Sequence, residues 1–185
     1  MPNWTYNCMT FKNEKDFRKV VKKCVVDNQF DFNTVVPMPK LLKDTESGTE
    51  EWSLLEFAKD MQDTPENIVE SYTKTRNYNI SAERKRKLAN CLKALKIYGT
   101  PDWYDWACQQ WGTKWNAQNT NIDEFNLTIS FDTAWSTPGA FLEAFAKKYP
   151  KISCEVYAQN ESAGDGYGVY NISIHDGAIY VNEHS

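Results

Sequence analysis

Histidine and cysteine are the residue types that most often carry nucleophilic or metal chemistry, and this chain has two histidines and five cysteines. His175 and His184 have no second histidine and no paired cysteine at metal-ligand spacing, and no C-x-x-C motif occurs. We therefore expect no metal site, no cofactor and no catalytic residues. A cysteine–histidine nucleophile pair would meet only in space, so the sequence leaves that alternative open.

The cysteines also indicate the redox compartment. Their number is odd and they are widely spaced, at Cys8, Cys24, Cys91, Cys108 and Cys154. That pattern is typical of reduced thiols in a cytosolic protein rather than of a disulfide framework. The first residues show no secretory signal, and no run of about 18 apolar residues occurs that could span a membrane. We therefore expect a cytoplasmic location, in a bacterial host cell, and no membrane partner.

Carboxylates are unevenly distributed in this chain, whose net charge is −4. Residues 41–75 contain nine acidic and three basic residues, and residues 97–185 contain eleven and four. Repulsion within such a stretch would keep it solvated until a basic partner arrives, so we expect a partner-binding surface here. The alternative is a helix surface that is merely soluble. The carboxylates in question, called the acidic block below, are Glu46, Glu50, Glu51, Glu56, Asp60 and Asp63, and Asp165 and Tyr167 at the rim of the sheet are expected to join them.

A short basic run, Arg84-Lys85-Arg86-Lys87, lies between the two acidic stretches. A phosphate-binding patch would use such a run, but no basic stretch elsewhere extends it. We therefore expect it to be the solvated side of a helix. The glycine-rich segment 164–168 is expected to be a bulged turn, because a strand rather than a helix N-terminus follows it.

Tryptophan is the most concentrated aromatic residue. Trp103 and Trp106 share one helix face, so burial in the core explains them. The segment Trp111-Gly112-Thr113-Lys114-Trp115 is harder to explain as core, because a glycine that ends the helix separates the rings. We expect this turn to dock the helices onto the sheet, with Lys114 over an indole ring. The alternative is a ligand pocket lined by Trp111, Lys114, Trp115 and Trp135.

The periodicity of apolar residues predicts the elements that position these groups. The N-terminal part predicts a strand over residues 4–11, a helix capped by Asn13 and a second strand over residues 30–36. The middle predicts four helices. One covers residues 50–61, and the others begin at the N-cap signals of Thr64-Pro65, Ser81 and Thr100-Pro101.

The last third returns to strands, over residues 126–131, 152–156, 169–175 and 178–181, with a helix after Thr137-Pro138 and a type I′ turn at Asp176-Gly177. Together these elements predict the α+β class, with a ferredoxin-like antiparallel sheet and a helical insertion. Residues 1–39 would form the N-terminal β-α-β part, residues 40–112 the insertion, and residues 113–185 the C-terminal ferredoxin-like part.

Three motifs occur together in this order: residues 1–7 (MPNWTYN), residues 111–117 (WGTKWNA) and residues 133–138 (TAWSTP). In this combination the chain resembles the YubB-like proteins of bacterial plasmids and phages, whose C-terminal part is called a YubB ferredoxin-like domain. The resemblance implies a mobile-element origin and the same sheet, and it brings no reaction and no catalytic residues. Those proteins carry an acidic residue where this chain has Asn116, which puts a salt bridge from that position to Lys114 in question.

These observations favour a non-enzymatic phage or plasmid accessory protein that binds a host macromolecule, and specifically an inhibitor of a host defence (CRISPR or restriction) nuclease. Its partner would be a host protein, such as a nucleic-acid-binding defence complex, whose basic channel accepts carboxylates in place of phosphates. The alternative is a single-stranded nucleic-acid-binding protein that stacks bases on Tyr157, Tyr167, Tyr170 and Tyr180. The net negative charge makes direct nucleic-acid binding the weaker of the two. The sequence does not define the oligomeric state.

Overall fold

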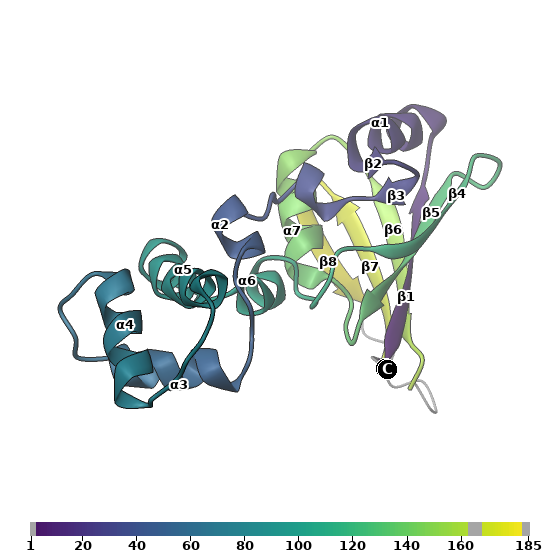
Figure 1. Ribbon diagram of the computed structural model, residues 1–185. Coiled ribbons are helices and arrows are strands. Elements are labelled where there is room, and N and C mark those ends of the chain that lie inside the picture. Colours follow the sequence, from purple (N-terminus) through teal and green to yellow (C-terminus); the bar gives the residue numbers. More distant parts are fainter. Residues whose placement is uncertain (1–2, 163–167, 183–185) are drawn as a thin grey trace. The chain divides into compact units, whose positions relative to one another are not determined.

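The computed structural model describes residues 3–162 and 168–182. The chain divides into two compact units (Figure 1). The sheet unit comprises residues 1–37 and 107–185, and the helical unit comprises residues 38–106. Each unit has its own internal packing.

The sheet unit contains one six-stranded sheet in the order β4-β5-β1-β6-β7-β8, in which all neighbours are antiparallel (Figure 1). Of the helices in the described part of the chain, α1 (Glu14–Cys24) and α7 (Gly139–Lys148) lie wholly within this unit. The strands are β1 (Trp4–Phe11), β4 (Gln118–Asp123), β5 (Thr128–Ala134), β6 (Cys154–Asn160), β7 (Val169–His175) and β8 (Ala178–Asn182).

The connections of this sheet are those of a ferredoxin-like fold. In β1-α1-β4 the two strands run parallel with β5 between them, and in β5-α7-β6 they run parallel with β1 between them. These two interleaved split units are the ferredoxin-like core, and the β7–β8 hairpin extends it at one edge. The predicted fold class is therefore confirmed.

Alternation along β1 separates two faces of the sheet. Met9 and Phe11 are buried on the face that α1 and α7 cover, where Phe17 of α1 contacts Phe11 edge-to-face at 5.9 Å. The neighbouring positions Trp4, Tyr6 and Cys8 lie on the opposite face and are partly or fully exposed. That second face is called the open face below.

The strand predicted over residues 30–36 is wrong. Those residues form the end of a two-residue strand, β3 (Gln29–Phe30), which pairs with β2 (Val25–Val26), and then a 3-10 turn, η1 (Phe32–Thr34). Phe30 and Phe32 are buried because their rings stack on Phe131 and Phe141, and not because they alternate in the sheet. The sheet position that the prediction gave to residues 30–36 belongs to β4. This edge strand is polar and has no apolar alternation to reveal it.

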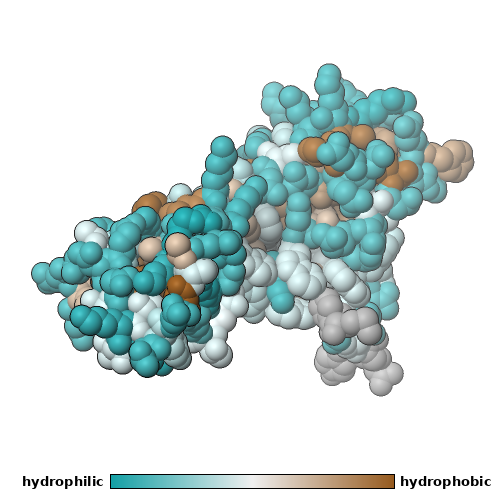
Figure 2. All heavy atoms as spheres, viewed as in Figure 1, coloured by the Kyte–Doolittle hydropathy of each residue, from teal (hydrophilic) through white to brown (hydrophobic). Residues whose placement is uncertain are grey.

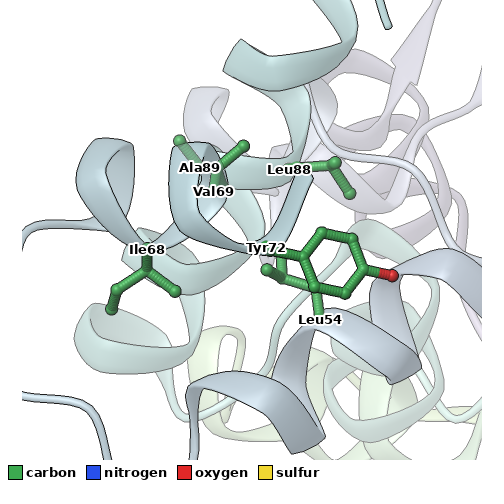
Figure 3. Packing of buried hydrophobic residues seen from close by; sticks show 6 residues of the cluster. All are labelled: Leu54, Ile68, Val69, Tyr72, Leu88 and Ala89. Atoms are coloured by element: carbon green, nitrogen blue, oxygen red, sulfur yellow. The ribbon is translucent and has the colours of Figure 1, made fainter. Parts of the chain in front are cut away.

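The helical unit contains α2 (Lys40–Lys43), α3 (Thr49–Ala58), α4 (Pro65–Thr75) and α5 (Ala82–Tyr98), and α6 (Trp103–Gln110) begins in it. Leu54, Ile68, Val69, Tyr72, Leu88 and Ala89 form its core, where α3, α4 and α5 meet (Figure 3). Thr64 and Ser81 accept backbone hydrogen bonds from Asn67 and Arg84, so these two N-cap predictions are confirmed.

Two other predicted caps are wrong. Asp102, rather than Thr100, caps α6, since its Oδ1 accepts the N–H groups of Tyr104 and Asp105 at 2.9 Å each. Thr137 does not cap α7, whose N-cap residue is Pro138. The predicted hairpin turn is confirmed, with positive φ at both Asp176 and Gly177.

Candidate functional site

Half of the acidic block, Glu46, Glu50 and Glu51, pairs with the basic run of the same chain. Arg84 of α5 is the centre of this contact: its Nη1 lies 2.5 Å from Glu46 Oε2 and 2.7 Å from Glu51 Oε1, and its Nη2 lies 2.5 Å from Glu50 Oε2. Glu51 is only 3% exposed. Glu51 therefore does not belong to a solvated face, which corrects the expectation for this residue. Glu46 and Glu50 are 45% and 26% exposed and are already paired with a cation of this chain, and partner binding by these two stays a prediction.

The other basic residues of this run continue the pairing. Lys87 Nζ lies 2.6 Å from Glu46 Oε1, Lys85 Nζ lies 2.7 Å from Glu70 Oε2, and Arg86 pairs with Asp44. The side chains of this run are 22 to 54% exposed, so the run lies on a partly solvated helix face, and each of its cations is paired with a carboxylate of this chain. In Figure 2, hydrophilic side chains cover most of the visible surface of the helical unit, which is consistent with this surface network.

The ion pairs of this network shift the pKa values of Arg84 and Glu46. Burial, the largest single effect, lowers the pKa of Arg84, but hydrogen bonds and charges from Glu50 and Glu51 outweigh it and the pKa is raised. A hydrogen bond from Lys87, with the charge of Arg84, lowers the pKa of Glu46 below its ordinary value. The arrangement therefore stabilises the charged forms within this chain.

The remaining predicted partner residues keep their place on the surface. Glu56 is exposed and lies 3.9 Å from Lys59 of its own helix turn. Asp63 accepts hydrogen bonds from Thr64 N–H and Asn67 Nδ2, which lower its pKa. Asp60 is exposed. Partner binding by these three residues stays a prediction, and Asp165 and Tyr167 lie outside the described residues.

The predicted tryptophan pocket separates into a core residue and a surface cluster. Trp111 is buried, donates its Nε1–H to Val36 O at 3.0 Å and packs against Phe32. Lys114 Nζ lies 4.6 Å from the ring centre of Trp115 and 4.8 Å from that of Trp135. The predicted position of Lys114 over an indole is confirmed, and two rings rather than one receive the cation.

The three sequence motifs converge at this end of the sheet. Trp4 lies opposite Ala134, and its ring centre is 6.1 Å from that of Trp115. The backbone of the second motif approaches the N-terminus of α7, where Phe141 N–H donates to Trp111 O at 3.2 Å. Asn116 is occupied elsewhere, because its Nδ2 donates to Asp31 Oδ1 and its Oδ1 accepts Phe32 N–H.

An apolar cavity of about 400 Å³ lies beside Trp135. The hydroxyl of Thr137 in its wall is buried and has no hydrogen-bond partner among the residues that the structure describes. Trp135 has a φ of 72°, which is uncommon for a residue with a side chain. The other residues that shape the wall include Tyr170, Ile172, Ile179 and Val181. A cavity with these walls suits an apolar ligand or side chain. Tyr170 lines this cavity and therefore does not lie on the open face.

Tyrosines are the main aromatic residues on the open face. Tyr6, Tyr157 and Tyr180 are 44%, 38% and 47% exposed. Cys8 lies opposite Tyr157, and Tyr6 lies opposite Asp132 on β5 and Gln159 on β6, so Tyr6 and Tyr157 are diagonal neighbours on adjacent strands. Burial raises the pKa of Tyr6, and Cys8 and Asp132 add to the shift. Tyr6 was not among the predicted site residues, although alternation within residues 4–11 places it beside Trp4 and Cys8.

Carboxylates flank these tyrosines. Asp132 accepts a hydrogen bond from Asn119 Nδ2 at 2.9 Å, and Glu155 accepts one from Ser173 Oγ and lies 3.5 Å from Lys12 Nζ. The ring of His175 stacks on Tyr180 with centres 4.3 Å apart. The open face is thus an aromatic surface with an acidic character.

Three of the cysteines are buried: Cys24, Cys91 and Cys154. Burial raises the pKa of all three, to about 12 for Cys91 and Cys154, so these groups stay protonated thiols. Among the described residues, no group of three or more histidine, cysteine or acidic side chains could hold a metal ion. Within the same residues, no helix is both long and apolar enough to cross a membrane.

The match to one family model agrees with the ferredoxin-like topology of the sheet. The family model described as the ferredoxin-like domain in Api92-like protein matches residues 110–181. Among solved structures, the crystal structure of a protein api92 from Yersinia pseudotuberculosis is similar at 12% identity and a TM-score of 0.44, with 100% of this chain and 99% of that chain covered. Comparison with curated proteins gives no match. Residues 110–181 of this chain therefore carry a ferredoxin-like domain similar to that of Api92-like proteins.

Proposed function

We propose that this chain is a non-enzymatic accessory protein of a bacterial plasmid or phage, akin to the YubB-like proteins, and that it binds a host protein in the cytoplasm. The binding surface is the open face of the sheet. The observation that carries this proposal is the row of exposed tyrosines, Tyr6, Tyr157 and Tyr180, on the face opposite α1 and α7. Tyrosine is enriched at the centres of protein–protein interfaces, because it combines a large apolar ring with a polar end.

The charges of the open face select the partner. Asp132 and Glu155 lie among the tyrosines, and Lys12 offsets Glu155 at 3.5 Å. An aromatic surface with residual negative charge fits a basic protein surface better than an acidic one. The partner class that we propose is a nucleic-acid-binding defence protein, whose basic groove would accept these carboxylates where phosphates normally lie.

This proposal is tested by affinity capture from host cells with two matched variants. The first changes Tyr6, Tyr157 and Tyr180 to Ser. The second changes Trp52 and Tyr98, which are 60% and 39% exposed in the helical unit, to Ser. We expect a host protein that the wild type and the second variant retain and the first variant loses. Retention of every captured protein by the first variant would refute the role of the open face.

Single-stranded nucleic acid is the second candidate ligand, because tyrosines on adjacent strands of a ferredoxin-like sheet can stack bases. The carboxylates beside the tyrosines oppose it, since they repel phosphates. Fluorescence anisotropy with a labelled single-stranded oligonucleotide at low salt separates the two candidates. Binding by the wild type that the tyrosine variant loses would favour nucleic acid, and no binding at micromolar protein would leave the protein partner as the better explanation.

A further inference from the structure

The two edges of the sheet differ in how they are protected. β4 is polar, its register with β5 shifts between Gln118 and Asn121, and its Thr120 hydroxyl accepts the Phe30 N–H of β3. A bulge and a covering segment of this kind prevent the addition of further strands. Within residues 3–162 and 168–182, β8 has neither a bulge nor a covering segment: it pairs with β7 in unbroken register, and its five residues include no charge and no proline.

The open edge of β8 presents both backbone groups and apolar side chains. In an antiparallel pair every second residue turns its N–H and C=O away from the partner strand, so β8 offers unpaired groups along its outer side. Tyr180 and Val181 are 47% and 50% exposed. Val181 and Ile179 lie on the face that carries the apolar cavity beside Trp135. Edge strands of soluble proteins usually carry a feature that prevents further pairing. The lack of such a feature in the described part of β8 favours pairing of this edge with another strand.

We propose that β8 pairs antiparallel with β8 of a second copy of this chain, so that the two sheets join edge to edge. An uncharged strand is complementary to itself, because no like charges meet when it is paired about a two-fold axis. In a register centred on Tyr180, Ile179 of one copy lies opposite Val181 of the other, on the same face in both. The apolar row that begins at the cavity therefore continues across the junction. This inference does not depend on the proposed host partner.

Sedimentation velocity over a series of protein concentrations tests the association. We expect reversible dimers of the wild type, and a dissociation constant raised about tenfold or more by Val181→Lys, because a charge on an edge strand opposes pairing. Val26→Lys is the matched control: Val26 is also a strand valine and is 46% exposed, but it lies in the β2–β3 hairpin. Circular dichroism checks that both variants fold.

Hydrogen–deuterium exchange locates the junction in the same samples. The amides of residues 178–182 should become slower to exchange as the concentration of the wild type rises, and should not change with concentration in Val181→Lys. A wild type that stays monomeric over the whole series would overturn the proposal. It would also be overturned by a dimer that protects residues 118–123 instead, or by one that Val181→Lys leaves intact.

Discussion

Arg84 has more ionic partners than any other residue described in the helical unit. Its guanidinium holds Glu46, Glu50 and Glu51 together, and it is 22% exposed while Glu51 is 3% exposed. Surface ion pairs usually contribute little to stability, but a buried carboxylate that loses its counter-ion is costly. The stability of this unit should therefore depend on Arg84 far more than on its neighbours in the basic run.

Replacing Arg84 by Met tests this dependence. The variant keeps an apolar stem and leaves Glu51 without its cation, so we expect it to lower the free energy of unfolding by about 2 to 3 kcal/mol, near the lower end for a buried pair. Arg86→Met is the control, because Arg86 is 54% exposed and pairs with Asp44. It should cost less than about 1 kcal/mol. Urea denaturation measures both, and equal losses would contradict the central position of Arg84.

The pairing of Glu46 with Lys87 can be tested by the pH dependence of the free energy of unfolding in acid. Its pKa is lowered in the folded chain by the hydrogen bond from Lys87, so the unfolded chain takes up a proton more readily. The contribution of Glu46 is present above its ordinary pKa of 4.5 and is lost as pH falls through the folded value. Between about pH 5 and pH 3, Glu46→Gln should therefore lose less stability than the wild type.

Glu56→Gln is the control for this pH series, since Glu56 is 80% exposed and its partner Lys59 is 3.9 Å away. Its curve should follow that of the wild type. If Glu46→Gln and the wild type lose stability in parallel over the whole acid range, the pairing of Glu46 with Lys87 does not contribute to folding in solution.

At the scale of elements, the turn after α6 and the start of α7 are held against each other. Gly112 has a φ of 78°, and a Cβ there would lie 3.0 Å from Gly139 N and 3.1 Å from Ala140 N. The Ser136 hydroxyl also donates to Gly112 O at 2.7 Å. Glycine is required here for two reasons, its backbone conformation and the close approach of α7.

Two glycine variants separate these reasons. Gly99→Ala meets the same left-handed backbone, with φ of 74°, but no atom within 4 Å of the new Cβ. It should cost about 1 kcal/mol, whereas Gly112→Ala should cost about 2 to 4 kcal/mol because overpacking is added. Chemical denaturation compares the two. Equal decreases in the free energy of unfolding would show that α7 shifts to accommodate the added methyl group at no energetic cost.

Elements with their own local signals could be predicted from the sequence. The cap-and-proline pair at Thr64 and the turn at Asp176-Gly177 satisfy their backbone groups locally, and both are where the sequence predicts them. Thr100 and Thr137 have the same local pattern, but Asp102 supplies the competing cap in one case and the second motif occupies the helix start in the other. β4 escaped detection because a bulged polar edge strand has no periodicity.

At the scale of the whole molecule, the fold was more predictable than the site. The ferredoxin-like class follows from the aromatic-rich composition of β1, the apolar alternation of β5, β6 and β7, and the order of helices and strands, which the insertion between α1 and β4 does not obscure. The partners of the acidic block could not be predicted, since Arg84 lies 34 residues from Glu50 and 38 from Glu46 along the chain. Counting charges by segment therefore gave two separate charged surfaces, whereas in the structure Glu46, Glu50 and Glu51 form ion pairs with the basic run. That pairing is why the open face, rather than the acidic block, is the better candidate interface.

Photo-crosslinking in living bacterial host cells tests this central claim most directly. A benzophenone amino acid replaces Tyr157 or Tyr180 on the open face, and Trp52 or Ile97 in the helical unit, which are 60% and 63% exposed, for comparison. The account predicts one protein adduct of the same mass at Tyr157 and Tyr180 and its absence at Trp52 and Ile97. Adducts confined to Trp52 or Ile97, or adducts at the tyrosines that nuclease removes, would contradict it.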